Sequence, residues 1–267
     1  MSDLQSSLDE AAWDVFARHQ PYFHILSDPQ MWNPKHEDEA RFWKAGEEDI
    51  ARLTRFAQLH SDADQAVDFG CGLGRLTRAL KAISKKQIGI DISPQMIEKA
   101  QALNASFPKS EFRVIRQGRW PVETASADLV VSLLVLQHLS SEKLIVQSLQ
   151  EMSRVLKRGG RAVFQLVTLR WTGQCVKFLK EGWSRMILTQ SSPQRERLRR
   201  RLLEISAGSG QDLSNEEIMN ELMQMEFRRI RSLPLLRLKG AMRAGSLHVD
   251  QLLREPNGST TVAATKV

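Results

Sequence analysis

The chain has 267 residues, of which 42% are hydrophobic and 26% are charged. This is the composition of an ordinary globular protein, and it argues against a disordered chain, a coiled coil or a disulfide scaffold. The longest apolar run, residues 128–136, reaches about half of the roughly 20 residues that a membrane-spanning helix needs, so no span is predicted. Two cysteines, Cys71 and Cys175, cannot build a metal site by themselves, and no metal is predicted.

The charge of +7 is unevenly distributed along the chain. Residues 1–150 carry 17 Lys and Arg against 20 Asp and Glu, whereas residues 151–267 carry 21 against 11. A basic C-terminal part can meet nucleic acid, anionic lipid or a phosphorylated substrate, or it can simply be a solvated face. The N-terminus lacks the basic flank and the apolar core of a secretory signal, so we expect a cytoplasmic protein.

Short apolar segments alternate with amphipathic ones from Gln65 onward, which is typical of a parallel sheet covered on both faces. The pattern predicts an α/β fold, namely a Rossmann-like, doubly wound, mostly parallel seven-stranded sheet. The expected strands are residues 66–69, 87–90, 112–115, 129–134, 161–167, 227–233 and 246–252.

Aromatic density and interruptions of this alternation divide the chain into five parts. The aromatic-rich residues 1–50 are expected to form an N-terminal helical cap, and two amphipathic pieces suggest a helical insertion after the fifth strand. The tail mixes Pro, Asn, Gly, Ser and Thr and is expected to be flexible. The predicted parts are the cap (1–50), the core (51–168), the insertion (169–213), the C-terminal part of the core sheet (214–254) and the tail (255–267).

The strongest local motif places three glycines at alternate positions, Gly70, Gly72 and Gly74, between the first strand and a helix. Such a loop lets a ligand lie against bare backbone. The spacing differs from the dinucleotide fingerprint, and Asp68 just before it would repel a pyrophosphate but attract an ammonium group. Asp91, at the end of the second strand, can accept both hydroxyls of a ribose.

Together with this loop and Asp91, two further segments resemble class I S-adenosylmethionine-dependent methyltransferases: residues 128–138, which end in Leu136-Gln137-His138, and residues 155–160, which end in Gly159-Gly160. The resemblance covers roughly residues 50–170. Pro21-Tyr22-Phe23 and residues 42–47 are also similar to a subgroup found beside glycan and natural-product pathways.

The resemblance implies a role for each matching residue. Asp68 and Gly70 would hold the methionine part of the cofactor, Gly72 and Gly74 would permit its close approach, and Asp91 would bind the ribose. The other cofactor-binding residues implied are Cys71 (as a small packing residue), Ile92, Gln117, Gly118, Leu133 and Leu134. At position 117 the family usually carries an acid that accepts the adenine amino group, and the amide oxygen of Gln117 can accept the same hydrogen bond.

We predict methylation of a small molecule or saccharide, and O-methylation of a hydroxyl is the preferred hypothesis. A base must then take the hydroxyl proton, and His138 is the candidate because it follows the fourth strand at the ligand-binding edge. The hydroxyl of Tyr22, the only tyrosine, can orient the acceptor or assist deprotonation. N- or C-methylation, an NAD(P)-dependent oxidoreductase and a catalytically silent cofactor-binding partner remain as alternatives.

We expect the cap and the insertion to form the acceptor pocket, because both carry more aromatic and apolar surface than loops require. The basic cluster Arg195 to Arg201 lies in this insertion. It suggests an anionic acceptor such as a phosphorylated or lipid-linked saccharide. No aromatic residue accompanies these arginines between Gln190 and Glu226, so we do not expect nucleic acid as a partner. A basic amphipathic helix can also rest on an anionic membrane, which predicts peripheral membrane contact.

Overall fold

A computed structural model describes residues 2–26, 39–139, 141–167, 235–255 and 259–267. The predicted insertion (169–213) and the strand expected at residues 227–233 lie outside these described residues.

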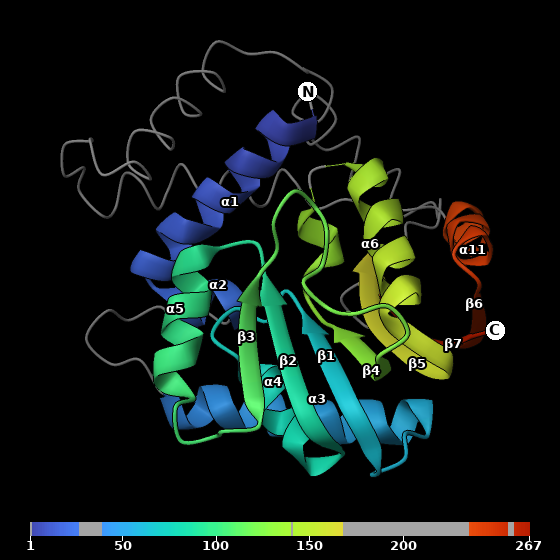
Figure 1. Cartoon of the computed structure of the whole chain (residues 1–267), viewed down its shortest axis with the longest axis horizontal. Helices are drawn as coiled ribbons and strands as arrows, with labels where there is room; N and C mark the ends of the chain where they lie inside the picture. Colours follow the sequence, from blue (N-terminus) through green and yellow to red (C-terminus); the bar gives the residue numbers. More distant parts are fainter. Residues whose placement is uncertain (1, 27–38, 140, 168–234, 256–258) are drawn as a thin grey trace.

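The described residues form one seven-stranded sheet with the order β3-β2-β1-β4-β5-β7-β6 (Figure 1). Strands β1 to β5 are parallel to one another, and β7 runs antiparallel to both β5 and β6. The strands are β1 (Ala63–Phe69), β2 (Ser84–Asp91), β3 (Ser110–Val114), β4 (Ala127–Ser132), β5 (Leu156–Val167), β6 (Leu247–Arg254) and β7 (Ser259–Lys266). The predicted doubly wound, mostly parallel sheet is confirmed.

Helices cover both faces of this sheet, because successive side chains of each strand point to opposite sides. On one face, α6 and α11 pack on alternate residues such as Val67, Phe69 and Val130. On the other face, α3 and α4 pack on the intervening Ala66, Leu129 and Val131. The helical elements are α1 (Ser2–Arg18), α2 (Pro21–Leu26), α3 (Glu39–Ala57), α4 (Arg75–Ala79), η2 (Leu80–Ala82), α5 (Pro94–Leu103), η3 (Leu136–His138), α6 (Glu142–Val155) and α11 (Leu235–Ala244).

The N-terminal cap differs from its predicted boundary. Helices α1 and α2 pack on Leu73 and Met96, outside the sheet. Helix α3, however, runs through residue 50 without a break, and its Ile50, Leu53 and Ala57 lie in the sheet core. The predicted boundary between cap and core therefore falls inside a core helix, because the aromatic residues that suggested the cap continue along its first turns.

The flexible tail predicted for residues 255–267 is wrong from Ser259 onward. Residues 259–266 form β7, an inner strand that pairs with β5 on one side and β6 on the other. The segment reads Ser-Thr-Thr-Val-Ala-Ala-Thr-Lys, and its β-branched Thr and Val favour a strand. The Pro, Asn and Gly that suggested looseness are confined to residues 256–258, outside the described part.

Within the described residues, no helix combines the length and the apolar character needed to cross a membrane.

Candidate active site

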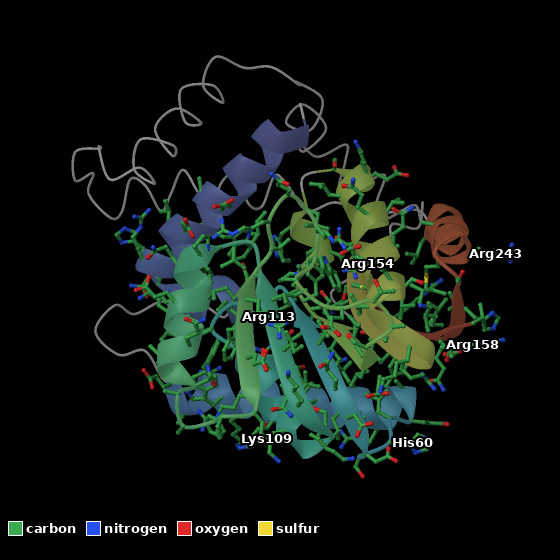
Figure 2. All side chains as sticks on the ribbon, in the orientation of Figure 1. His60, Lys109, Arg113, Arg154, Arg158 and Arg243 are labelled. Atoms are coloured by element: carbon green, nitrogen blue, oxygen red, sulfur yellow. The ribbon has the colours of Figure 1, made fainter. Side chains whose placement is uncertain are left out.

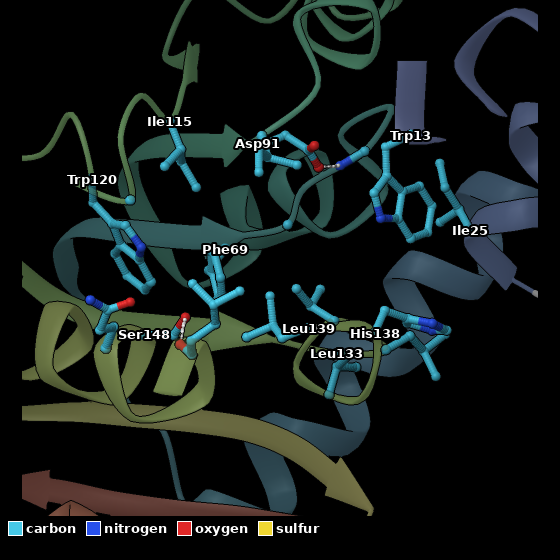
Figure 3. A pocket seen from close by; sticks show the side chains of 18 residues that line it. Trp13, Ile25, Phe69, Asp91, Ile115, Trp120, Leu133, His138, Leu139 and Ser148 are labelled. Atoms are coloured by element: carbon cyan, nitrogen blue, oxygen red, sulfur yellow. Dashed lines mark hydrogen bonds between the residues drawn. The ribbon is translucent and has the colours of Figure 1, made fainter. Parts of the chain in front are cut away.

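A pocket opens where β1, β2 and β4 end, at the carboxyl edge of the sheet (Figure 3). Ligands of open α/β sheets bind at this edge. Trp13, Ile25 and His138 lie at one end, Trp120 and Ser148 at the other, and Asp91 between them. The described residues that line the pocket are Trp13, Ile25, Phe69, Gly70, Gly72, Asp91, Ile92, Ile115, Gly118, Trp120, Leu133, Leu134, Val135, His138, Leu139, Leu144, Gln147 and Ser148.

Two glycines of the predicted loop present bare backbone to this pocket. Gly70 has φ +73° and Gly72 has φ +52°, a conformation that L side chains rarely adopt. A Cβ at Gly70 would lie 2.4 Å from Val135 Cγ2, and one at Gly72 would lie 2.7 Å from Ile25 Cδ1. Gly74 has φ +89° and precedes the first residue of α4, but it is not among the described lining residues.

Asp91 places a buried carboxylate on the pocket wall. Its Oδ2 accepts a hydrogen bond from the Gly72 N–H at 2.9 Å, and its Oδ1 accepts one from the Ser93 N–H at 2.9 Å. Burial raises the pKa of Asp91, and these backbone N–H groups oppose the shift. Each oxygen still has a lone pair for a further donor, so the carboxylate can receive the two hydroxyls of a diol.

The end of the pocket away from His138 has apolar walls held by α6. The Trp120 ring stacks on Phe69 with ring centroids 4.5 Å apart. Its backbone N–H donates to Glu151 Oε2 at 2.8 Å, and its carbonyl accepts from Arg154 Nη2 at 3.1 Å. Figure 2 labels Arg154 on α6, and a second bond from this residue, to the Val122 carbonyl, fixes the same segment.

The sequence predicted that Gln117 accepts a hydrogen bond from the adenine amino group, and it did not single out Trp120. In the structure Gln117 is exposed and does not line the pocket among the described residues, whereas Gly118 and Ile92 do. Ile115 and the α6 residues Gln147 and Ser148 were also missed, and Trp13 was not singled out within the cap that was expected to border the acceptor pocket. An aromatic residue five positions after the third predicted strand was the one signal that could have indicated Trp120.

The side chains of Asp68 and Cys71 are buried, and neither residue is among the described residues that line the pocket. Asp68 is 1% exposed and accepts a hydrogen bond from Thr77 Oγ1 at 2.7 Å. Burial raises the pKa of Asp68 to about 6, and the Thr77 hydroxyl and Arg75 oppose this shift. Burial also raises the pKa of the Cys71 thiol, which keeps it protonated and supports a packing role over a nucleophilic one.

The raised pKa of Asp68 predicts a pH-dependent cost to stability. The folded chain holds its proton up to about pH 6, whereas an unfolded Asp releases it near pH 3.8, so the free energy of unfolding falls as pH rises through this window. Asp68→Asn removes that loss. The free energy of unfolding of the variant, relative to that of the unmodified protein, should rise by about 2 kcal/mol from about pH 4.5 to about pH 7.5. Urea unfolding at each pH measures this difference. A difference that does not change with pH would contradict the buried carboxylate.

The two predicted catalytic residues have different surroundings. His138 ends η3 and lines the pocket, with Trp13 packed edge-on at a ring-centroid distance of 5.8 Å. Gln137 Nε2 lies 3.3 Å from His138 Nε2, where the amide can orient the imidazole. Tyr22 is buried, its hydroxyl donates to Glu39 Oε1 at 2.9 Å, and it is not among the described lining residues. The structure thus brings His138 to the pocket that the glycine loop borders but does not bring Tyr22 there.

Comparison with known proteins identifies the domain that carries this site. Residues 67–164 match the family model described as a methyltransferase domain. Demethylmenaquinone methyltransferase from Tropheryma whipplei is 32% identical over 100 residues, which cover 38% of this chain and 40% of that protein. An uncharacterized transposon protein of Streptomyces fradiae is 36% identical over 104 residues, 38% of this chain and 29% of that protein. The chain therefore covers well under half of either relative.

Solved structures agree with the fold. A chain in the solved complex of the Haloferax volcanii Trm112 methyltransferase activator superposes with a TM-score of 0.58 and 15% identity, covering 95% of this chain and 97% of that chain. Magnesium protoporphyrin IX methyltransferase from Synechocystis, solved with bound SAH, gives a TM-score of 0.54 and 13% identity, covering 84% and 83%.

This chain carries a class I S-adenosylmethionine-dependent methyltransferase domain. The resemblance found in the sequence is confirmed, and it favours the methyltransferase over the oxidoreductase alternative. The cofactor of this class is S-adenosylmethionine. The pocket suits it, because bare backbone at Gly70 and Gly72, the Asp91 carboxylate and the apolar Ile92 and Ile115 border one cavity.

Proposed function

We propose that this protein is an S-adenosylmethionine-dependent methyltransferase that methylates a hydroxyl group of a small molecule. One observation carries the proposal: the glycine loop, the Asp91 carboxylate and the His138 imidazole border the same pocket. S-adenosylmethionine supplies, when bound, a methyl group activated by a sulfonium. Gly70 and Gly72 leave room for it, Asp91 accepts hydrogen bonds from its ribose, and the apolar walls exclude water.

His138 is the candidate general base. A hydroxyl must lose its proton as the new bond to carbon forms, and the imidazole of a histidine that lines the pocket is the side-chain type suited to accept it. Gln137 would hold the imidazole ring in place. Other described lining residues do not offer a comparable base, because Asp91 is engaged by two backbone N–H groups and Ser148 donates to the Leu144 carbonyl.

The test of the catalytic assignment is His138→Ala. Turnover should fall about 100-fold, the usual contribution of a general base, with the affinity for S-adenosylmethionine kept within about threefold. Turnover should be measured as methyl transfer from labelled cofactor, and affinity by calorimetry. Full turnover in the variant would remove His138 from the reaction.

Tyr22→Phe is the matched comparison. Its hydroxyl is engaged by Glu39 away from the pocket, so we expect full turnover and a loss of about 1 kcal/mol in the free energy of unfolding. A large loss of turnover would restore the catalytic role predicted for Tyr22.

The acceptor class is tested by an unbiased screen. Labelled cofactor is added to a cell extract that is then divided into small-molecule, lipid, glycan, protein and RNA fractions. Label in a methyl ether of a small molecule supports the proposal, whereas label in a methyl ester would indicate a carboxylate acceptor and contradict it. Label on nitrogen or carbon favours the N- or C-methylation alternative, and no label in any fraction favours a silent cofactor-binding partner.

The predicted anionic or lipid-linked saccharide acceptor and the predicted membrane contact rest on residues 195–201, which lie outside the described residues. They remain predictions, as does a cytoplasmic location.

A further inference from the structure

The end of the pocket beside His138 is apolar and aromatic. Figure 3 shows Trp13, Ile25 and Leu133 near His138, and Leu134, Val135 and Leu139 from the same segment as His138 also line the pocket. No Lys or Arg is found among the described residues that line the pocket, and Asp91 is the one carboxylate among them. An anionic group bound here would be desolvated without a cationic partner from these residues, which is costly.

The buried carboxylate of the next residue, Asp14, fixes the position of Trp13. Asp14 is 8% exposed, and its Oδ1 accepts hydrogen bonds from Ser93 Oγ at 2.5 Å and from the Gln95 N–H at 3.2 Å. Ser93 also accepts from the Met96 N–H as the N-cap of α5. This network fastens α1 to the segment that directly follows Asp91.

Aromatic contacts hold the Trp13 ring as well. It packs edge-on against Phe16, with ring centroids 5.3 Å apart, and against His138 at 5.8 Å. Figure 3 shows Trp13 and His138 on the same side of the pocket, with Ile25 beside them. Ile25 covers Gly72, since a Cβ at Gly72 would lie 2.7 Å from Ile25 Cδ1. The cap thus brings an aromatic wall to the glycine loop and the candidate base at once.

We propose that this end of the pocket binds an uncharged, flat, largely apolar acceptor of the hydroxyarene class, with Trp13 as the specificity-determining residue. The inference rests on the proposed function and narrows its substrate class. A fixed indole recognises a ring through edge or face contacts and apolar burial, and the hydroxyl of that ring would meet His138.

The test is direct binding of matched probes. 1-Naphthol, its 4-sulfonate and methyl β-glucoside are titrated calorimetrically into the full chain, with and without saturating S-adenosylhomocysteine. We expect 1-naphthol to bind at least about tenfold more tightly than either the sulfonate or the glucoside. Equal or tighter binding of the sulfonate would overturn the proposal and support the anionic acceptor. Equal binding of the glucoside, or no binding of 1-naphthol, would also overturn it.

Variants of Trp13 then locate the contact. Trp13→Ala should weaken the binding of 1-naphthol about tenfold. Trp13→Phe keeps a ring and the packing of α1, so it should weaken this binding by less than about threefold. The matched control is Trp43→Ala. Trp43 lies on α3, packs on Arg78 and is not among the described lining residues, so its loss should leave 1-naphthol binding unchanged. Unchanged affinity in both Trp13 variants would overturn the assignment.

Titration of S-adenosylhomocysteine alone separates this inference from the proposed function. Its affinity should be within about twofold of the unmodified protein in the Trp13→Phe variant. If S-adenosylhomocysteine does not bind the unmodified protein, the proposed function fails. The titration of the three probes in the absence of S-adenosylhomocysteine still tests whether the pocket prefers an uncharged aromatic ligand.

Discussion

Gly72→Val should abolish cofactor binding, with an affinity for S-adenosylmethionine at least about 100-fold weaker than that of the unmodified protein. Two effects combine. The backbone at Gly72 has φ +52°, where a β-branched residue is strained by about 1–3 kcal/mol. The new side chain would also fill the loop surface that borders the pocket, since even its Cβ would lie 2.7 Å from Ile25 Cδ1. Calorimetric titration of the folded variant measures the loss.

Gly159→Val is the control for backbone strain alone. Gly159 has φ +79°, but a Cβ there would meet nothing within 4 Å, and the residue lies in β5 outside the described pocket lining. This variant should lose stability and keep its affinity for the cofactor. If Gly72→Val is folded and binds normally, the glycine loop is not the cofactor site.

Asp91→Asn should weaken the binding of S-adenosylmethionine about 100-fold. In the proposed complex the carboxylate would supply charged acceptors for the ribose hydroxyls, and charge-assisted hydrogen bonds contribute about 1.5–3 kcal/mol each. The amide also turns an N–H group toward Gly72 N or Ser93 N, both of which donate to Asp91. Affinity by calorimetry and unfolding by urea should be measured on the same samples, so that lost binding is separated from lost stability.

Asp128→Asn is matched to this change. Asp128 Oδ2 likewise accepts two backbone N–H groups, from Asp64 and Gln65, but it lies on β4 at the opposite end of the sheet. The variant should lose comparable stability without losing cofactor affinity. Equal losses of affinity in the two variants would mean that Asp91 acts through the fold and not through the ribose.

Most of the sheet could be predicted from the sequence because its signals are local. The expected strands at 66–69, 87–90, 112–115 and 161–167 all overlap observed strands, since buried parallel strands are short apolar segments bounded by turn residues. The start of α5 is equally local, because Ser93 is its N-cap and Pro94 its first residue. β7 was missed because its Thr and Ala residues carry no apolar alternation, and it becomes a strand only between β5 and β6.

The sequence by itself determined the glycine loop, the acid at the end of the second strand and the class of domain, because the glycine spacing and this acid impose their geometry within a few residues. Tertiary structure decided what surrounds them. The Asp14–Ser93 hydrogen bond joins residues 79 positions apart. Hydrogen bonds with Glu151 and Arg154 of α6 hold the backbone of Trp120 at the pocket. Tyr22 turns to Glu39 instead of the pocket. Such contacts depend on how distant segments pack, and residue patterns within one segment do not encode that packing.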